Sequence, residues 1–258
     1  MTDNPTDRRT RIAAAFGRAR GYDDAAAVQL AAAEWLAGRI GGLDLPANPA
    51  SLELGCGTGF LTRALRSAIG PARWTVSDIA PEMVERAQAS LDLAADYRVI
   101  DGEAVDQVLG PFDLIVSNMA FQWFADLSGA VSRLAALLAP GGTLAFSTMV
   151  AGSFAEWTQA LIEEGLPSGT PAYPDDAMLA ALAPQGFSAK VEIVNFPEEQ
   201  PDARTFLRRL KTIGAATPAS GYRPLSGPEL RRAIARFDTG PRTITYRIGF
   251  CLMLRISG

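Results

Sequence analysis

A glycine-rich segment near residue 55 carries the residue types best suited to binding a ligand. Glycine occupies every second position of Gly55-Cys56-Gly57-Thr58-Gly59, directly after the short apolar stretch 51–54. The residues from Phe60 onward have the pattern of a helix. Alternating glycines let the backbone turn tightly and a ligand approach closely, and a helix start presents free N–H groups. The spacing indicates a nucleotide-like ligand, although an ordinary strand-to-helix turn with spare glycines has the same local pattern.

The residues on either side of this loop distinguish between classes of nucleotide. In the dinucleotide fingerprint G-x-G-x-x-G, counted from Gly55, the last glycine falls where this chain has Phe60. A bulky residue there argues against the close packing that a dinucleotide requires. Glu53 could accept a hydrogen bond inside the loop or face the ammonium group of a ligand. The run from Glu53 to Gly59 resembles the first motif of the class I S-adenosylmethionine (SAM) methyltransferases.

Three further polar residues follow predicted strands and complete this candidate site. Asp78 comes 23 residues after Gly55, and an acidic residue about 20 positions after the loop can accept hydrogen bonds from both ribose hydroxyls. Asp101 follows the next predicted strand, where a carboxylate could meet an adenine amino group. Asn118 ends the strand after that. Because ligands of open α/β sheets bind at the carboxyl edge, these residues should lie close together.

Composition excludes several classes of function. The formal charge is −4 and the chain has no basic tract, which makes duplex nucleic acid and anionic membrane poor partners. It also has no histidine, so a histidine base and most catalytic zinc sites are excluded, and we expect no metal. Cys56 and Cys251 form no metal-binding pattern. We expect two free thiols, Cys56 being a small loop residue rather than a nucleophile, in a protein of the reducing cytoplasm that has neither a signal peptide nor a membrane span.

The elements that must position these residues alternate along the chain. Between residues 50 and 148, strand patterns alternate with helix patterns, which predicts a parallel sheet with helices on both faces. Two alanine-rich helices, separated at Gly21, precede this region, and two later strands follow it at 191–196 and 243–254. The strands expected in the alternating region lie at 51–54, 73–78, 97–100, 112–118 and 143–148, with helices beginning near 60, 81 and 127 and a turn at Pro140-Gly141-Gly142.

We expect one domain over residues 1–258. It would comprise an N-terminal helical lid (1–42), a SAM-binding core (43–150), and the remaining core (151–258) with a helical cap insertion at about 197–240. In this insertion Arg204, Arg208 and Lys211 share one helical face and apolar residues take the other. A solvated basic face and an anion-binding cap both fit this pattern.

Segments outside the cofactor motifs point to one family. Residues 12–23, 117–123 and 210–215, together with Thr245-Tyr246, are similar to the malonyl-[acyl-carrier-protein] O-methyltransferases of biotin synthesis. The resemblance, which spans residues 12–255, implies a Rossmann-like class I fold: a seven-stranded, mostly parallel sheet with helices on both faces, an N-terminal helical lid and a helical insertion between the last two strands. It also implies methyl transfer from SAM to the free carboxyl group of malonyl on an acyl carrier protein or coenzyme A, with S-adenosyl-L-homocysteine as product. The methyl ester would disguise malonyl as a fatty-acid primer.

The resemblance and the residue types together assign roles to specific side chains. A malonyl carboxyl group is ionised at neutral pH, so the reaction needs alignment rather than a general base. A cation must hold the carboxylate, for which Lys211 is the first candidate and Arg18 the second, and Tyr22 or Tyr246 would donate hydrogen bonds. Cations for an acidic carrier would be Arg204, Arg208, Arg231 and Arg232. The cofactor would contact Glu53, Gly55, Gly57, Gly59, Asp78, Ile79, Asp101, Gly102 and Asn118.

Other functions share parts of this pattern. A methyltransferase for another small acid or a metabolite amine would carry every cofactor motif. A non-catalytic assembly factor could have the same fold, but the intact glycines with Asp78 and Asp101 weigh against it. A nicotinamide dehydrogenase is disfavoured by Phe60 and by the lack of a proton donor. The sequence does not indicate an oligomeric state.

Overall fold

The computed structural model describes residues 5–18, 22–105, 109–213 and 221–256, and for residues 5–8, 22 and 24 it describes the backbone alone. The predicted break at Gly21 and the segment Gly214-Ala215 lie outside the described residues. The chain divides into two compact units. The sheet unit comprises Gln29–Thr148, Asp175–Ile193 and Gly249–Gly258, and the helical unit comprises Met1–Val28, Met149–Pro174 and Val194–Ile248. The single domain with an N-terminal lid stays a prediction.

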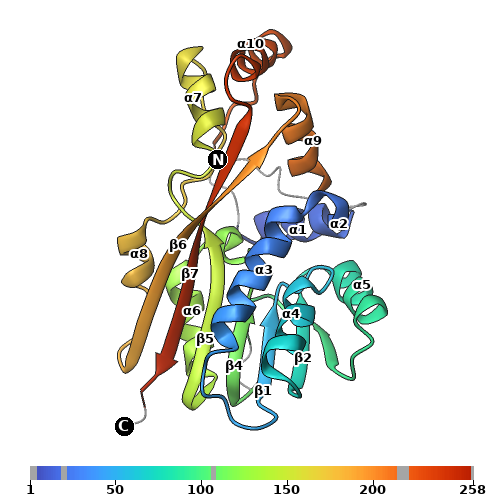
Figure 1. Cartoon of the computed structure of the whole chain (residues 1–258), viewed down its shortest axis with the longest axis vertical. Helices are drawn as coiled ribbons and strands as arrows, with labels where there is room; N and C mark the ends of the chain where they lie inside the picture. Colours follow the sequence, from blue (N-terminus) through green and yellow to red (C-terminus); the bar gives the residue numbers. More distant parts are fainter. Residues whose placement is uncertain (1–4, 19–21, 106–108, 214–220, 257–258) are drawn as a thin grey trace. The chain divides into compact units, whose positions relative to one another are not determined.

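Seven strands form one sheet, which confirms the predicted fold class. Parallel pairing joins β1 to both β2 and β4, β2 to β3, and β4 to β5, whereas β6 and β7 run in opposite directions (Figure 1). The central strands are apolar because both faces are covered, as is usual for parallel sheets. Their order is β3 (Asp96–Val99), β2 (Arg73–Asp78), β1 (Ala50–Leu54), β4 (Phe112–Ser117), β5 (Leu138–Met149), β7 (Thr243–Arg255) and β6 (Phe187–Glu199).

Helices cover both faces of the sheet within the sheet unit. Figure 1 shows α3 and α4 in front of the sheet and α6 behind it. Pro81 opens α5 with a preset backbone angle, and the Asp126 side chain caps α6 by accepting a hydrogen bond from the Gly129 N–H at 2.8 Å. On α3, Trp35 packs on Phe250 of β7 with ring centroids 4.0 Å apart. The elements are α3 (Ala27–Ile40), α4 (Phe60–Ile69), α5 (Pro81–Leu91), the 3₁₀ turn η1 (Phe121–Trp123), α6 (Leu127–Ala136) and α8 (Asp176–Ala180).

The helical unit is built around an aromatic cluster. Phe154 contacts Phe206 and Tyr246, while Trp157 contacts Phe206 and Phe237. These rings are buried, and such packing contributes about 0.5–1.5 kcal/mol per pair beyond area burial. They come from the C-terminal strand and from helices far apart in sequence. The helices of the unit are α1 (Pro5–Gly17), α2 (Tyr22–Ala25), α7 (Ala155–Glu163), α9 (Ala203–Thr212) and α10 (Gly227–Asp238).

The structure corrects three features of the predicted elements. The expected turn at 140–142 lies within β5, which begins at Leu138 and shifts register between Phe112 and Leu114 of β4. β6 is longer than expected, from Phe187 to Glu199. The insertion contains α10 in addition to the predicted basic helix, and its start was readable: Ser226 and Glu229 form a capping box. No helix in the described parts of the chain is long and apolar enough to cross a membrane.

Candidate functional site

The glycine loop joins β1 to α4 in the sheet unit and requires glycine for conformational and steric reasons. Gly55, Gly57 and Gly59 have φ values of 68°, 54° and 91°, a region that L side chains rarely adopt. A Cβ on Gly55 would lie 2.7 Å from the Cβ of Ala120, and one on Gly59 would lie 2.7 Å from Leu91 Cδ2. Gly59 is the N-cap of α4 and no side chain caps that helix. The start of α4 is therefore available to a ligand.

Glu53 lies beneath the loop, and its side chain is 1% exposed. It accepts a hydrogen bond from the Thr62 hydroxyl in the first turn of α4, which ties β1 to that helix. Burial raises the pKa of Glu53 to about 8, and the nearby Asp78 carboxylate acts in the same direction, while the Thr62 hydrogen bond and Arg63 partly oppose the shift. Of its two predicted roles, the structure shows the hydrogen bond inside the loop. Contact with a ligand's ammonium group stays a prediction.

Asp78 closes the loop from the end of β2. Its carboxylate accepts hydrogen bonds from the Gly57 N–H at 3.0 Å and the Ala80 N–H at 2.9 Å. Burial raises the pKa of Asp78, and the N–H groups of Ala80, Gly57 and Ile79 partly offset that shift. A carboxylate oxygen can accept more than one hydrogen bond, so these contacts orient the group and leave acceptor capacity for ribose hydroxyls. The structure thus brings Asp78 directly to the predicted glycine loop, and the N–H of Ile79 donates to the Asp78 carboxylate.

Two serines that sequence reasoning missed bind the strands together at this edge. The Ser77 hydroxyl donates to the Glu53 carbonyl at 2.7 Å, and the Ser117 hydroxyl donates to the Leu54 carbonyl at 2.8 Å. Both side chains are fully buried. Each serine directly precedes a predicted ligand residue, Asp78 or Asn118. A repeated serine before a polar residue at the end of an apolar strand was the signal available in the sequence.

Asn118 lies at the predicted edge, and its side chain holds structural elements together. Its Nδ2 donates to the Gln29 carbonyl at 2.9 Å, and its Oδ1 accepts from the Ser147 hydroxyl at 2.7 Å. Met119, the next residue, has φ 55° and its N–H also donates to the Ser147 hydroxyl. The Asn118 side chain therefore fixes the geometry of the segment over the glycine loop. A direct cofactor contact from Asn118 stays a prediction.

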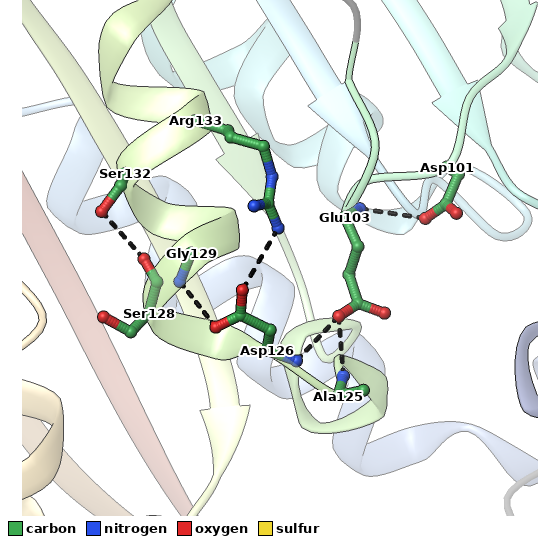
Figure 2. A network of polar contacts seen from close by, with 8 residues as sticks. All are labelled: Asp101, Glu103, Ala125, Asp126, Ser128, Gly129, Ser132 and Arg133. Carbon is green, nitrogen blue, oxygen red and sulfur yellow. Dashed lines mark hydrogen bonds and ion pairs between the residues drawn. The ribbon is translucent and has the colours of Figure 1, made fainter. Parts of the chain in front are cut away.

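Asp101 and Gly102 occupy the loop after β3. Asp101 Oδ1 accepts from the Glu103 N–H at 2.9 Å, and a Cβ on Gly102 would lie 2.7 Å from Phe124 Cζ. Figure 2 shows Glu103 reaching across to the start of α6, where its carboxylate accepts from the N–H groups of Ala125 at 2.8 Å and Asp126 at 2.9 Å. Glu103 is 6% exposed, and sequence reasoning treated it only as a loop residue. It positions the Asp101 loop against the segment that follows β4.

Gln122 supplies an unsatisfied acceptor on this same segment. Its Nε2 donates to the Met119 carbonyl at 2.6 Å, which fixes the side chain. Its Oε1 is buried and has no hydrogen-bond partner within the described residues. A buried acceptor without a donor costs about 1–3 kcal/mol, and a ligand N–H or O–H would recover that cost after a small local shift. This segment lies close to both loops of the candidate site. Its Ala120 approaches Gly55 of the glycine loop, and its Phe124 approaches Gly102 of the Asp101 loop.

These features fit a SAM-like cofactor better than a dinucleotide. Two acidic side chains, Asp78 and Asp101, lie at the ends of neighbouring strands, as adenosine recognition requires. Phe60 is the first residue of α4, and it stands at the position where close packing against a dinucleotide needs glycine. The glycine loop, the two carboxylates and the Gln122 acceptor together provide close backbone approach and hydrogen-bond acceptors.

The four predicted substrate residues all belong to the helical unit and come from four separate segments of it. Lys211 is exposed in the last turn of α9, and Arg18 is exposed directly after α1. Tyr246 is 5% exposed within β7, where burial raises its pKa and Glu198 adds to the shift. Tyr22 begins α2, but its side chain lies outside the described residues. Because α2 contacts α9, the segments of Tyr22 and Lys211 are near each other.

Of the predicted carrier-binding cations, Arg204, Arg208 and Arg231 are exposed. Arg232 is also exposed, and it pairs with Glu164 at 3.1 Å.

Both cysteines are free thiols, as expected, and both are buried. Burial raises the pKa of Cys56 well above its ordinary value, with Asp78 and Glu53 adding to the shift, and raises that of Cys251 to about 12. A neutral buried thiol is a poor nucleophile, in agreement with the expected role of Cys56 as a small loop residue. The reducing cytoplasm expected from the cysteine usage stays a prediction.

Comparisons with known proteins identify the chain as a methyltransferase. Residues 52–142, which contain the glycine loop and both acidic residues, match a family described as "Methyltransferase domain". The Biotin biosynthesis bifunctional protein BioCD of Bordetella avium (strain 197N) is 44% identical over 230 residues, which cover 89% of this chain and 49% of that protein. The chain therefore spans about half the length of that relative. The Malonyl-[acyl-carrier protein] O-methyltransferase of Magnetococcus marinus (strain MC-1) is 40% identical over 247 residues, covering 94% of this chain and 91% of the relative.

Solved structures support the fold alone. The YcgJ protein from Bacillus subtilis has a TM-score of 0.58 and 16% identity, covering 88% of this chain and 99% of its own. The plantazolicin methyltransferase BpumL in complex with SAH has a TM-score of 0.54 and 13% identity, covering 98% and 97%.

Proposed function

The chain belongs to the malonyl-[acyl-carrier protein] O-methyltransferase family, and on that premise we propose that it methylates the free carboxyl group of malonyl carried on an acyl carrier protein. The enzyme class is SAM-dependent methyltransferase. The product would be the malonyl methyl ester, an early intermediate of biotin synthesis, together with S-adenosyl-L-homocysteine.

One observation carries the proposal: similarity to the Magnetococcus relative extends over 94% of the chain. It therefore includes the helical unit, where the substrate residues are predicted, as well as the glycine loop of the sheet unit. Cofactor motifs alone would be shared by methyltransferases of every substrate class. The substrate assignment rests on the activity for which that relative is named.

The chemistry of the substrate explains why so few reactive side chains are needed. A malonyl carboxyl group has a pKa of about 3–4, like other carboxyl groups, so it is already a nucleophilic anion at neutral pH. When bound, SAM supplies an electrophilic methyl group on a positively charged sulfur. The chain has no histidine, and its two thiols are buried and protonated. The proposed reaction accordingly uses no general base, and alignment is the main contribution of the protein, worth up to about 7–11 kcal/mol.

The residues of the sheet unit would hold the cofactor. Asp78, oriented by the N–H groups of Gly57 and Ala80, would accept hydrogen bonds from the ribose hydroxyls. Asp101 would accept from the adenine amino group, and the glycine loop would admit the methionine end. The Oε1 atom of Gln122, held by the bond from its Nε2 to Met119, would accept a further hydrogen bond from the ligand.

The residues of the helical unit would hold the substrate. We propose Lys211 as the cation for the malonyl carboxylate and Arg18 as the alternative, because both are basic side chains and both are exposed. Tyr22 and Tyr246 would shape the site. Burial keeps Tyr246 protonated, so its hydroxyl can only act as a neutral donor or acceptor.

A methyl-transfer assay tests the proposal. The protein is incubated with SAM and, in separate reactions, malonyl-carrier protein, malonyl coenzyme A, free malonate and acetyl-carrier protein. The proposal predicts transfer to the malonyl thioesters, fastest on the carrier protein, and none to the acetyl control, which has no free carboxyl group. Methylation of small acids with no turnover of malonyl thioesters would assign the chain a different substrate.

A further inference from the structure

A cavity of about 320 Å³ lies wholly within the helical unit, and none of its lining residues has been assigned a cofactor, substrate or carrier role above. Its walls are aromatic and aliphatic side chains of α7, α9, α10 and the loops at 169–173 and 222–225. Phe154, Trp157, Leu161 and Phe206 form its buried floor, each no more than 8% exposed. Small-molecule sites in proteins are about 300–1,000 Å³, so the cavity is large enough for part of a ligand.

Hydrogen bonds outside the cavity anchor α7 and both loops that form its walls. Glu156 anchors α7 by accepting from the Thr245 N–H at 3.0 Å, and the Ala151 N–H holds the 169–173 loop through the Pro174 carbonyl at 2.9 Å. Arg223 fixes the 222–225 loop through two bonds to Glu229, at 2.9 and 3.1 Å. Walls that are anchored independently of one another make a preformed site rather than a packing gap that would collapse.

The lining determines the charge of the occupant. None of the described residues that line the cavity is charged, and the polar groups offered are the hydroxyls of Thr170, Tyr173 and Tyr222. Burial raises the pKa of Tyr173, so that hydroxyl stays neutral. Moving an ionised carboxylate or phosphate into such surroundings without a counter-charge costs several kcal/mol. The occupant is therefore a neutral group with a few hydrogen-bonding atoms.

Cations flank the lining residues on the same helices. On α9, exposed Arg208 and Lys211 each directly follow a lining leucine, and on α10 exposed Arg231 follows Leu230. Within the described residues, neither Lys211 nor Arg231 makes an ion pair. An occupant with a neutral body and an anionic end would match both features. A phosphopantetheine arm has this chemistry: amides, a hydroxyl and a dimethyl carbon in the middle, with a phosphate where it joins the carrier.

We propose that the cavity binds the uncharged pantetheine arm of the acyl thioester substrate. This inference rests on the proposed function and identifies where the enzyme recognises the handle rather than the malonyl group. The same cavity would accept the arm of malonyl coenzyme A, since the two handles share it.

Gly169 provides a way to narrow the cavity by one methyl group. A Cβ on Gly169 would lie 3.0 Å from Cζ and 3.2 Å from Cε1 and Cε2 of the Tyr222 ring, so an alanine would add a methyl group to the lining and displace this ring, which also lines the cavity. Gly169 does not have a positive φ, so alanine causes no backbone strain. Leu210→Trp narrows the cavity from α9, where the side chain is half-buried. Gly38→Ala is the matched control, because a Cβ there would meet nothing within 4 Å.

The kinetic test compares malonyl-carrier protein with malonyl-N-acetylcysteamine, which lacks the dimethyl and hydroxyl part of the arm. Gly169→Ala and Leu210→Trp should raise KM for the carrier substrate about tenfold and change kcat/KM for the truncated substrate less than about twofold. Gly38→Ala should change neither. Equal effects on both substrates, or no effect on either with both variants folded, would overturn the inference.

A binding test separates this inference from the proposed function. Reduced pantetheine is titrated into the full chain by calorimetry without SAM, so that no turnover is needed. The wild type and the Gly38→Ala control should bind pantetheine equally well. Both narrowed variants should bind it about tenfold more weakly. If the enzyme methylates malonyl thioesters but pantetheine binds all variants equally, the inference fails while the function stands. The same holds if the cavity binds decanol, a purely apolar probe, and not pantetheine. If pantetheine binding follows the prediction but no malonyl substrate is methylated, the function fails.

Discussion

At the residue scale, two buried carboxylates control the geometry of the glycine loop. Glu53 ties β1 to α4 through Thr62, and Asp78 orients the loop through the Gly57 N–H. Burial raises the pKa of both. Two carboxylates that are close together and withdrawn from water cannot both ionise cheaply, so one should hold a proton at neutral pH. Glu53, with a pKa of about 8 and a hydroxyl partner, is that group.

Stability should therefore depend on pH through Glu53. Its pKa is about 8 when folded and near the ordinary 4.5 when unfolded. Between these values the folded state keeps a proton that the unfolded state loses. The contribution of Glu53 to the free energy of unfolding is therefore fully present below pH 4.5. It falls by up to about 1.4 kcal/mol per pH unit as the pH rises towards 8. Urea unfolding of Glu53→Gln, measured against the wild type, should show a difference that grows in favour of the variant across this window. Asp78 and Arg63 remain in both proteins, so parallel curves would contradict the assignment.

Asp78 should determine cofactor affinity. Asp78→Ala would remove the proposed charge-assisted hydrogen bonds to ribose and should weaken SAM binding by about 1.5–3 kcal/mol, measured by calorimetry. Asp78→Asn keeps an acceptor for the loop N–H groups and serves as the control for local structure. Unchanged SAM affinity in the folded alanine variant would show that Asp78 does not contact the ribose.

At the element scale, strands and their ends could be predicted from the sequence, whereas contacts between distant segments could not. β2 has the predicted bounds, Arg73–Asp78, because a short apolar run ends in a polar residue. The glycine loop and Asp78 could be predicted for the same reason, because each lies at the end of an apolar strand. The bonds from Glu103 to the start of α6 and from Asn118 to Gln29 depend on which segments become neighbours after folding. The Pro140–Gly142 turn was expected before the strand, whereas β5 already pairs with β4 at Leu138 and pairs again from Thr143, with a register shift between the two.

α9 is the element whose exposed face should meet an acidic carrier protein. Arg204 and Arg208 are exposed on that face, one turn apart. The double substitution Arg204→Glu, Arg208→Glu should raise KM for malonyl-carrier protein by about tenfold or more at low salt, with a smaller effect at high salt because the interaction is screened. Turnover of malonyl-N-acetylcysteamine, which carries no acidic protein, is the control. A loss that is the same for both substrates, or that does not depend on salt, would place the carrier elsewhere.

At the scale of the whole molecule, the predicted roles divide between the two units. Every predicted cofactor residue, from Glu53 to Asn118, lies in the sheet unit, and Arg18, Tyr22, Lys211 and Tyr246 lie in the helical unit. The cavity also lies entirely in the helical unit. We therefore expect cofactor affinity and substrate recognition to respond to different sets of substitutions.

Lys211→Ala tests this division. Because Lys211 belongs to the helical unit, SAM affinity should change less than about twofold, while malonyl methylation should fall by about tenfold or more through loss of the carboxylate's cation. Calorimetry and the methyl-transfer assay measure the two effects. If the folded variant retains more than a third of its activity, Lys211 is not the carboxylate ligand and Arg18 becomes the candidate.

The most direct measurement of the central claim is the chemical nature of the methylated product. Malonyl-carrier protein is reacted with SAM labelled in its methyl group, and the intact product is analysed by mass spectrometry before and after mild alkali. The proposed function predicts one labelled methyl group on the malonyl unit, which alkali releases as methanol because it is held as a carboxyl ester. A label that stays attached after alkali, or that appears on the carrier protein itself, would contradict carboxyl methylation.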